Sequence, residues 1–411
     1  MTRVVIVGAG LAGVRAAETL RSEGFVGQVT IFGDELHLPY DRPPLSKQLL
    51  ARSWEPDRIL LRRSDDYAAT LHVDLMRATT VESLDLQERS IRTDRGTVPF
   101  DGLVIASGAR ARRLPGTDGR SDIHVVRTLD DCLSLRSRFA SLGPQGRVAV
   151  IGAGFIGAEV AATAHGLGLR VEIVEAAPLP LERQLGAAMA AHCAGLHARH
   201  GVTLRTGVGV AEIGSGQLTL TDGAVIAADV VVVGVGVAPN TEWLAGSGVR
   251  LDDGVVCDSA CRVTDAAGLP ISGIVAAGDV ARWPNRLFEA EETMRVEHWT
   301  NAAEMGAHAA QTLIADLAGE PGRAADFTPI PYFWSDQYET KIQFIGRTAG
   351  FDEVRVVAGS VEDAKFLALY RRGDRLIGAL GLTMMRQLIG YRKLLAEKAG
   401  WADAIAHAER G

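Results

Sequence analysis

Two stretches of the chain share one plan: a short apolar strand, the glycine pattern G-x-G-x-x-G and an alanine-rich helix. The first reads RVVIVGAGLAG at residues 3–13, and the second reads RVAVIGAGFIG at residues 147–157. Each continues into another apolar strand, at 29–32 and 171–174, which is followed by an acidic residue. This order is typical of the βαβ unit of a parallel sheet. The repeat therefore predicts an α/β chain with two Rossmann-like domains.

The glycines stand where a bound dinucleotide requires them. They are Gly8, Gly10 and Gly13 in the first copy, and Gly152, Gly154 and Gly157 in the second. The first glycine of each copy permits the tight turn, the second lets the backbone approach a pyrophosphate, and the third lets the helix pack on the sheet. The helix N-terminus then presents free N–H groups to the phosphates. Each copy is therefore a candidate dinucleotide site.

The acid after the second strand is expected to hold ribose hydroxyls. Asp34 and Glu35 are the candidates in the first copy, and Glu175 is the candidate in the second. A carboxylate at this place accepts hydrogen bonds from a free 2′-hydroxyl but repels a 2′-phosphate. Glu175 therefore favours NADH, although Arg183 nearby in the sequence leaves NADPH open.

Five further sequence motifs accompany the two glycine repeats. They are LPYDRPPLSK at 38–47, DGLVIASGA at 101–109, IVAAGDV at 274–280, EHWTNAAEMG at 297–306 and PYFWSDQ at 331–337. With the glycine repeats they resemble the FAD-dependent pyridine-nucleotide reductases, specifically the ferredoxin reductases of the putidaredoxin reductase and aromatic-ring dioxygenase type. The resemblance covers nearly the whole chain. It implies that the first copy binds FAD and the second binds NADH.

The resemblance also assigns site residues. Beyond the glycines and acids of the first copy, it implies FAD contacts for Arg42, Lys47, Ser107, Gly108, Gly278, Asp279, Glu297, His298, Trp299 and Trp334. On the NADH side it adds Glu159, Arg183 and Gly236. Lys47 and Glu159 are expected to pair where nicotinamide meets flavin, and they are the candidate catalytic residues.

We expect a discontinuous domain arrangement. An FAD domain takes residues 1–112 and 246–322, an NADH domain is inserted at 113–245, and a small α+β domain occupies 323–411. The last domain is expected to end in a helix that contains residues 389–398.

The expected activity is that of an FAD-dependent NADH:ferredoxin oxidoreductase. A hydride passes from NADH to FAD, and single electrons then leave for a 2Fe–2S ferredoxin that serves a cytochrome P450 or a ring-hydroxylating dioxygenase. Cys132, Cys193, Cys257 and Cys261 form no C-x-x-C pair, and none lies in the loop at 36–47, so disulfide chemistry and a metal site are not expected. A rubredoxin reductase, an NADH oxidase and an NADH-sensing flavoprotein similar to apoptosis-inducing factor remain alternatives.

The charge of the chain bears on its partner, and its apolar stretches bear on its compartment. The formal net charge of −7 argues against a general nucleic-acid binder. An acidic ferredoxin nevertheless needs a basic dock, and the candidates are Arg295, Lys341, Arg347, Arg386, Arg392, Lys393 and Lys398. No apolar stretch approaches the roughly 20 residues of a membrane span. We expect a cytoplasmic protein.

Overall fold

The computed structural model describes residues 1–288 and 292–410, which divide into two compact units. The first unit consists of Met1–Asp41, Ile59–Arg110 and Ala238–Pro331. The second consists of Arg42–Arg58, Ala111–Val237 and Tyr332–Gly411. The first glycine repeat thus belongs to the first unit, and the second repeat shares a unit with the C-terminal segment. The division into three domains stays a prediction.

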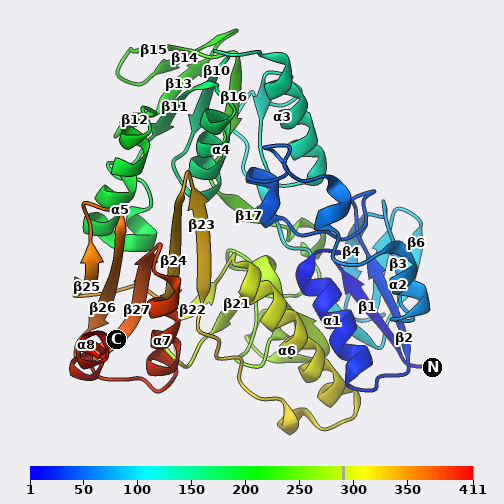
Figure 1. Ribbon diagram of the computed structural model, residues 1–411. Helices are drawn as coiled ribbons and strands as arrows, with labels where there is room; N and C mark the ends of the chain where they lie inside the picture. Colours follow the sequence, from blue (N-terminus) through cyan, green and yellow to red (C-terminus); the bar gives the residue numbers. More distant parts are fainter. Residues whose placement is uncertain (289–291, 411) are drawn as a thin grey trace. The chain divides into compact units, whose positions relative to one another are not determined.

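A six-stranded sheet with the order β19-β20-β7-β1-β2-β3 forms the centre of the first unit (Figure 1). Its strands are β1 (Arg3–Val7), β2 (Gln28–Phe32), β3 (Asp74–Met76), β7 (Gly102–Ile105), β19 (Arg262–Thr264) and β20 (Pro270–Ala276). All neighbours are parallel except β19 and β20. Helices α1 (Leu11–Ser22) and α6 (Trp299–Leu317) contact this sheet and each other. The predicted βαβ unit is confirmed, with α1 ending just before Glu23.

Smaller elements complete the first unit. Two three-stranded sheets consist of β4 (Val81–Asp85), β5 (Ser90–Thr93) and β6 (Gly96–Pro99), and of β18 (Val255–Val256), β21 (Ala281–Pro284) and β22 (Thr293–Arg295). A short helix, α2, spans Ser64–Ala69. Two of the passages of the chain between the units lie within β8 (Ala109–Ala111) and β17 (Val237–Pro239).

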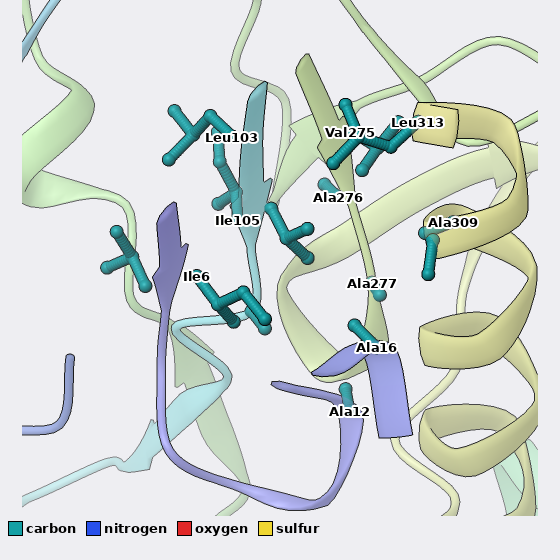
Figure 2. Packing of buried hydrophobic residues seen from close by; sticks show 14 of the residues in the cluster. Ile6, Ala12, Ala16, Leu103, Ile105, Val275, Ala276, Ala277, Ala309 and Leu313 are labelled. Atoms are coloured by element: carbon teal, nitrogen blue, oxygen red, sulfur yellow. The ribbon is translucent and has the colours of Figure 1, made fainter. Parts of the chain in front are cut away.

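The core of the first unit combines large strand residues with small helix residues. Figure 2 shows Ile6, Leu103 and Ile105 of the sheet together with Ala12 and Ala16 of α1. The helices α1 and α6 approach closely because Gly306 of α6 lies against the backbone of Ala12, where a Cβ atom would overlap the carbonyl oxygen. Small residues at this crossing let both helices cover the same sheet.

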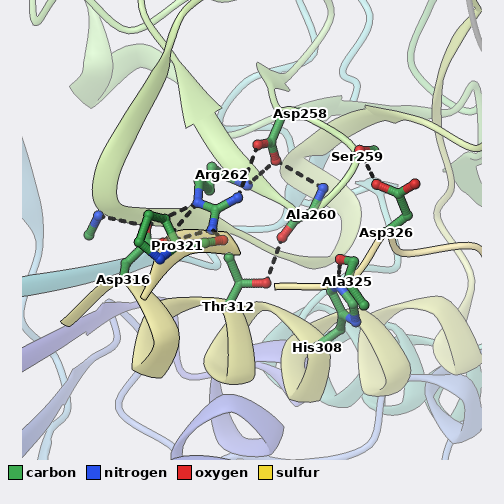
Figure 3. A network of polar contacts seen from close by, with 11 residues as sticks. Asp258, Ser259, Ala260, Arg262, His308, Thr312, Asp316, Pro321, Ala325 and Asp326 are labelled. Carbon is green, nitrogen blue, oxygen red and sulfur yellow. Dashed lines mark hydrogen bonds and ion pairs between the residues drawn. The ribbon is translucent and has the colours of Figure 1, made fainter. Parts of the chain in front are cut away.

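A buried ion pair ties the end of α6 to the edge of the sheet (Figure 3). Arg262 of β19 lies 2.8 Å from an oxygen of Asp316, whose side chain is fully buried. Asp316 also accepts a hydrogen bond from the backbone N–H of Gly273 at 3.0 Å, and Arg262 donates to the carbonyl of Pro321 at 2.7 Å. The carboxylate is therefore both neutralised and hydrogen-bonded, as a buried charge requires.

Replacing Asp316 by asparagine should lower the stability of the protein by about 3 kcal/mol, because the largely buried Arg262 guanidinium then keeps only its longer pair with Asp258, at 3.4 Å. Urea denaturation would measure the loss as a lower midpoint. The matched control is Glu320→Gln, which breaks an Arg323–Glu320 pair whose side chains are 75% and 51% exposed. The control midpoint should stay within experimental error of the wild type. Equal midpoints for the two variants would contradict a structural role for the buried pair.

The second unit contains a five-stranded parallel sheet with the order β12-β11-β10-β16-β9. Its strands are β9 (Ile123–His124), β10 (Arg147–Ile151), β11 (Arg170–Glu175), β12 (Thr203–Thr206) and β16 (Val230–Val233). The helices of this part are α3 (Leu129–Ser141), α4 (Phe155–Gly166) and α5 (Glu182–Arg199). A small antiparallel sheet follows, with β13 (Val210–Ile213), β14 (Gln217–Leu220) and β15 (Val225–Ala227). The second predicted βαβ unit is also confirmed.

The C-terminal segment forms an antiparallel sheet with the order β23-β24-β27-β26-β25. Its strands are β23 (Tyr332–Gln337), β24 (Thr340–Gly346), β25 (Glu353–Ser360), β26 (Lys365–Arg372) and β27 (Arg375–Leu382). Helices α7 (Met385–Ala396) and α8 (Trp401–Glu409) follow. The predicted final helix over 389–398 is wrong at its end: α7 stops at Ala396, Lys398 has a left-handed φ of 56°, and a further helix follows.

Helix α5 and the C-terminal sheet share one hydrophobic core. Leu185, Met189 and Cys193 of α5 pack in the same cluster as Phe366 and Tyr370 of β26. The hydroxyl of Tyr370 donates to the carbonyl of Leu185 at 2.7 Å. This common core explains why the second nucleotide-type sheet and the C-terminal sheet belong to one compact unit.

Candidate functional site

The first glycine loop leaves an open place at the start of α1. Gly8 has a φ of +118°, and a Cβ there would overlap the carbonyl of Ala106, so both the turn and the packing require glycine. Gly10 is different, because its backbone is extended and no atom lies within 4 Å of a Cβ built on it. Gly10 is also the N-cap of α1, and no side chain caps this helix end. Free N–H groups beside open space are what a pyrophosphate needs.

The second loop repeats this geometry in the second unit. Gly152 has a φ of +97°, and its Cβ would lie 2.5 Å from the carbonyl oxygen of Gly234. Gly154 is extended, caps α4 without any side-chain hydrogen bond, and meets only one atom, at 4.0 Å. The repeated sequence therefore gives a repeated cradle, and the residues present fit two dinucleotides.

The acids that follow the two loops are placed differently. Glu175 ends β11, and its carboxylate accepts hydrogen bonds from the N–H groups of Ala153 at 2.8 Å and Ala177 at 2.9 Å. These bonds fix the carboxylate beside the second glycine loop, at the edge where a ribose would bind.

In the first copy the equivalent strand position is a glycine. Val7 pairs with Phe32 as Ile151 pairs with Val174, so Gly33 corresponds to Glu175. A Cβ on Gly33 would lie 2.6 Å from that of Ala9, which excludes a larger side chain. The acids come later: Asp34 is exposed, whereas Glu35 is half-buried and accepts a 2.5 Å hydrogen bond from the Tyr40 hydroxyl. Of the two candidates, Glu35 is the one whose side chain is held in place.

Several predicted FAD residues of the first unit gather at the carboxyl edge of its sheet. Val7 and Ala276 both pair with Ile105, so Gly8, Ser107 and Gly278 follow three adjacent strand ends. Ligands of open α/β sheets bind outside this edge. Gly108 and Asp279 come directly after two of these residues. The Ser107 hydroxyl donates to the carbonyl of Asn240 at 2.8 Å.

The start of α6 carries the next predicted group. His298 is the N-cap residue, and burial lowers its pKa to about 4, so its ring is neutral at neutral pH. Trp299 begins the helix and donates from its indole N–H to Asp41 at 2.8 Å. Glu297 forms an ion pair with Arg295 at 2.6 Å. The structure thus orders this segment within the first unit, while its contact with FAD stays a prediction.

The second unit contains the predicted Lys47–Glu159 pair. Glu159 lies in α4 and is 2% exposed, and its Oε2 lies 2.9 Å from Lys47 Nζ. Two serine hydroxyls also donate to this carboxylate, from Ser46 to Oε2 at 2.5 Å and from Ser335 to Oε1 at 2.9 Å. The backbone N–H of Asp336 adds a bond to Oε1 at 3.2 Å. A buried carboxylate of α4 is therefore held by residues from two other stretches of the chain, at 46–47 and 335–336.

Neither serine appeared among the residues predicted from the sequence. The signal lay in the pattern of β23, whose buried positions are Phe333, Ser335 and Gln337. Two polar residues on the buried face of a strand need a polar partner. Trp334 alternates with them, is half-buried and stacks on Tyr332 with ring centroids 5.8 Å apart.

The other predicted residues of the second unit have simpler surroundings. Arg42 donates to the carbonyl of Arg127 at 2.6 Å. Arg183 is exposed in the first turn of α5. Gly236 has a φ of +91°, and no atom lies within 4 Å of a Cβ built on it. These three assignments to nucleotide contacts stay predictions.

The predicted docking cations are not equivalent. Arg295 is wrong as a surface cation, because its side chain is 10% exposed and bonds Glu297 and Asp253. Lys341 pairs with Asp336 at 3.1 Å. Helix α7 exposes a set of basic and apolar side chains, of which Lys393 pairs with Glu397 at 3.7 Å, namely Met385, Arg386, Ile389, Arg392 and Lys393. We call these five residues the α7 patch.

The cysteines do not supply a redox thiol. All four are buried and free. Burial raises the pKa of Cys132 and of Cys193 to about 12, and it also raises the pKa of Cys257 and of Cys261. Because the thiolate is the reactive form, these side chains are inert at neutral pH. Across the described residues we find neither a cluster of ligands for a metal ion nor a helix with the length and apolar character of a bilayer span.

Known proteins resemble this chain over nearly its full length. Rhodocoxin reductase of Rhodococcus erythropolis is 38% identical over 96% of this chain and 89% of its own length. The ferredoxin–NAD(+) reductase component of the anthranilate 1,2-dioxygenase system of Burkholderia cepacia is 36% identical over 96% of this chain and 94% of its own. The crystal structure of the covalent putidaredoxin reductase–putidaredoxin complex aligns with a TM-score of 0.88 and 32% identity, covering 97% of this chain and 93% of the other.

Two family models match the sequence itself. The model described as "Reductase C-terminal" matches residues 332–409, which hold the antiparallel sheet and the last two helices. The model described as "Pyridine nucleotide-disulphide oxidoreductase" matches residues 2–306, which include both glycine loops. The chain is therefore a member of the pyridine nucleotide-disulphide oxidoreductase family, an FAD-dependent oxidoreductase that carries a reductase C-terminal domain.

Proposed function

We propose that this protein is an NADH:ferredoxin oxidoreductase that supplies single electrons to a 2Fe–2S ferredoxin of a cytochrome P450 or ring-hydroxylating dioxygenase system. The observation that carries the proposal is the pair of uncapped helix ends at Gly10 and Gly154, one in each unit. Two dinucleotide cradles in one chain fit FAD at the first and NADH at the second. The relatives described above support the choice of a ferredoxin as acceptor.

The chemistry divides between the cofactor and the chain. When bound, FAD would supply the redox chemistry, namely two-electron uptake from NADH and one-electron release. The chain binds both dinucleotides, and Glu175 selects the free 2′-hydroxyl of NADH. Lys47 is the proposed cation beside the flavin, an assignment that comes from the family resemblance, and Glu159 holds its ammonium group in place. Inert thiols leave the electrons to an external acceptor.

Turnover with a panel of acceptors tests the proposal. Purified protein with FAD and NADH should reduce a 2Fe–2S ferredoxin much faster than it reduces rubredoxin or oxygen. Faster reduction of rubredoxin would instead indicate a rubredoxin reductase, and faster reduction of oxygen would indicate an NADH oxidase. Slow turnover with all three, combined with NADH-dependent assembly, would favour an NADH-sensing flavoprotein.

The α7 patch is the proposed dock for the acidic ferredoxin. Reversing charge in the double variant Arg386→Glu, Lys393→Glu should lower ferredoxin reduction about tenfold at low salt, because complementary charges speed association. The difference from wild type should shrink at high salt, where screening weakens both encounters. NADH-to-ferricyanide turnover should not change.

The control for this surface is Arg323→Glu, which reverses an exposed cation of the first unit. It should leave ferredoxin reduction unchanged. Equal loss of the ferricyanide and ferredoxin activities in the double variant would show that α7 does not dock the partner.

The cytoplasm is the proposed compartment. The four cysteines are all free thiols, as is usual in a reducing compartment.

A further inference from the structure

The acceptor capacity of Glu159 is filled by the chain itself. A carboxylate offers about four acceptor positions. Four donors reach Glu159: Ser46 and Lys47 bond Oε2, while Ser335 and the backbone N–H of Asp336 bond Oε1. These four donors fill the acceptor positions of the carboxylate. Glu159 therefore acts through Lys47 instead of touching the substrate.

Lys47 keeps donors to spare. Its ammonium group has three N–H bonds, and in the described part of the chain Glu159 is its one hydrogen-bond partner. Its side chain is 11% exposed, so the group is largely shielded from water. The direction of the remaining donors is then fixed by where the carboxylate holds the nitrogen atom.

Ser335 sets the orientation of that carboxylate. Ser335 is fully buried, and Gln337, which is 1% exposed, donates from Nε2 to the serine oxygen at 3.4 Å. With its oxygen engaged as an acceptor, the hydroxyl directs its own hydrogen to Glu159 Oε1 at 2.9 Å. Ser46 fixes the other oxygen, and its carbonyl is in turn held by the hydroxyl of Thr163 at 2.8 Å. Each of the two carboxylate oxygens thus accepts a hydrogen bond from one serine hydroxyl.

We infer that Ser335, with Ser46, is a positioning residue for hydride transfer, acting through Glu159 to aim the Lys47 ammonium group. The inference rests on the proposed function, since it assigns Lys47 to the flavin. It also makes β23 of the C-terminal domain a structural part of the hydride-transfer site. Loss of the Ser335 hydroxyl lets the carboxylate turn about its last bond, and Lys47 loses its fixed direction.

Single-turnover reduction of bound FAD by NADH, measured without oxygen, tests this inference. Ser335→Ala and Ser46→Ala should each slow the step about tenfold at saturating NADH, with the dissociation constant of NADH unchanged. Ser335→Thr keeps the hydroxyl and should restore most of the rate. The midpoint potential of the flavin should fall in the alanine variants, because a poorly placed cation stabilises the reduced ring less.

The matched control is Thr312→Val. Thr312 is 1% exposed and donates to the carbonyl of Ala260 at 2.8 Å, so the change removes a buried hydroxyl of the first unit with no link to Glu159. Rates and potentials in Ser335→Ala and Ser46→Ala that match this control would overturn the inference. If Ser335→Ala fails to fold, Ser46→Ala and Ser335→Thr still decide the question.

The outcome is separable from the proposed function. A wild-type protein whose FAD is reduced by NADH but that passes no electrons to ferredoxin would refute the function and leave the inference standing. Wild-type reduction of ferredoxin with no effect of either serine would do the reverse.

Discussion

Valine at position 10 should yield a folded protein that contains no FAD. The extended backbone of Gly10 suits any residue, and no atom lies within 4 Å of the new Cβ, so the chain itself has room for the side chain. The pyrophosphate would have no room, because the valine methyl groups would occupy the space through which it reaches the N–H groups of α1. We expect FAD to bind at least a hundredfold more weakly. The flavin content per chain after purification, and titration of the purified chain with FAD, would measure this loss.

Valine at position 154 is the matched variant in the second cradle. Gly154 has the same extended backbone, and the nearest atom lies 4.0 Å away. This protein should keep its FAD, and its flavin should remain oxidised at NADH concentrations that fully reduce the wild type. Circular dichroism and the urea midpoint should match the wild type in both variants. Loss of flavin from Gly154→Val, with retention in Gly10→Val, would reverse the assignment of the two sites.

Glutamine at position 159 should leave FAD bound and slow its reduction by NADH about a hundredfold. The amide keeps the size of the carboxylate but removes the charge that opposes Lys47, and its NH₂ group must face donors that the carboxylate accepted. Loss of a preorganised electrostatic group typically costs this much in rate. Removing one partner of a buried pair should also lower stability by about 3–5 kcal/mol.

Stopped-flow reduction of the flavin separates these effects from general damage. The control is Glu172→Gln, which breaks a half-exposed pair with Arg205 at 3.0 Å in the same unit. It should reduce FAD at the wild-type rate. A normal rate in Glu159→Gln would show that the pair serves stability alone.

The nucleotide cradles were predictable from the sequence because each depends on local geometry. A tight turn, an open approach and a close helix packing all demand glycine at fixed spacing, and the structure has all three in both copies. The different placement of the acids after the two glycine loops was only partly predictable from the sequence. Glu175 was predictable because it ends its strand, whereas in the first copy Gly33 takes the equivalent position, where its contact with Ala9 excludes a larger side chain.

The surroundings of Glu159 were not predictable from spacing. Ser46 lies 113 residues before Glu159 in the sequence, and Ser335 lies 176 residues after it, so only the tertiary fold brings their hydroxyls to one carboxylate. The exposure of a charged side chain was likewise not predictable from the sequence. Arg295 reads as a surface cation in sequence, but packing buries it against Glu297 and Asp253.

The boundary of the C-terminal segment shows a different limit. Helix propensity continues past Ala396, yet Lys398 takes a left-handed conformation and the chain turns into α8. The shared core of α5 and β26 was likewise not predictable from the sequence. Apolar periodicity shows that one face of an element is buried, but it does not show which other element packs on that face.

Anaerobic titration of the purified protein tests the central claim most directly. We expect one FAD per chain, full bleaching of the flavin by one equivalent of NADH, and return of the oxidised spectrum when two equivalents of oxidised 2Fe–2S ferredoxin are added. A protein without flavin, a flavin that NADH does not bleach, or a bleached flavin that ferredoxin does not reoxidise would contradict it.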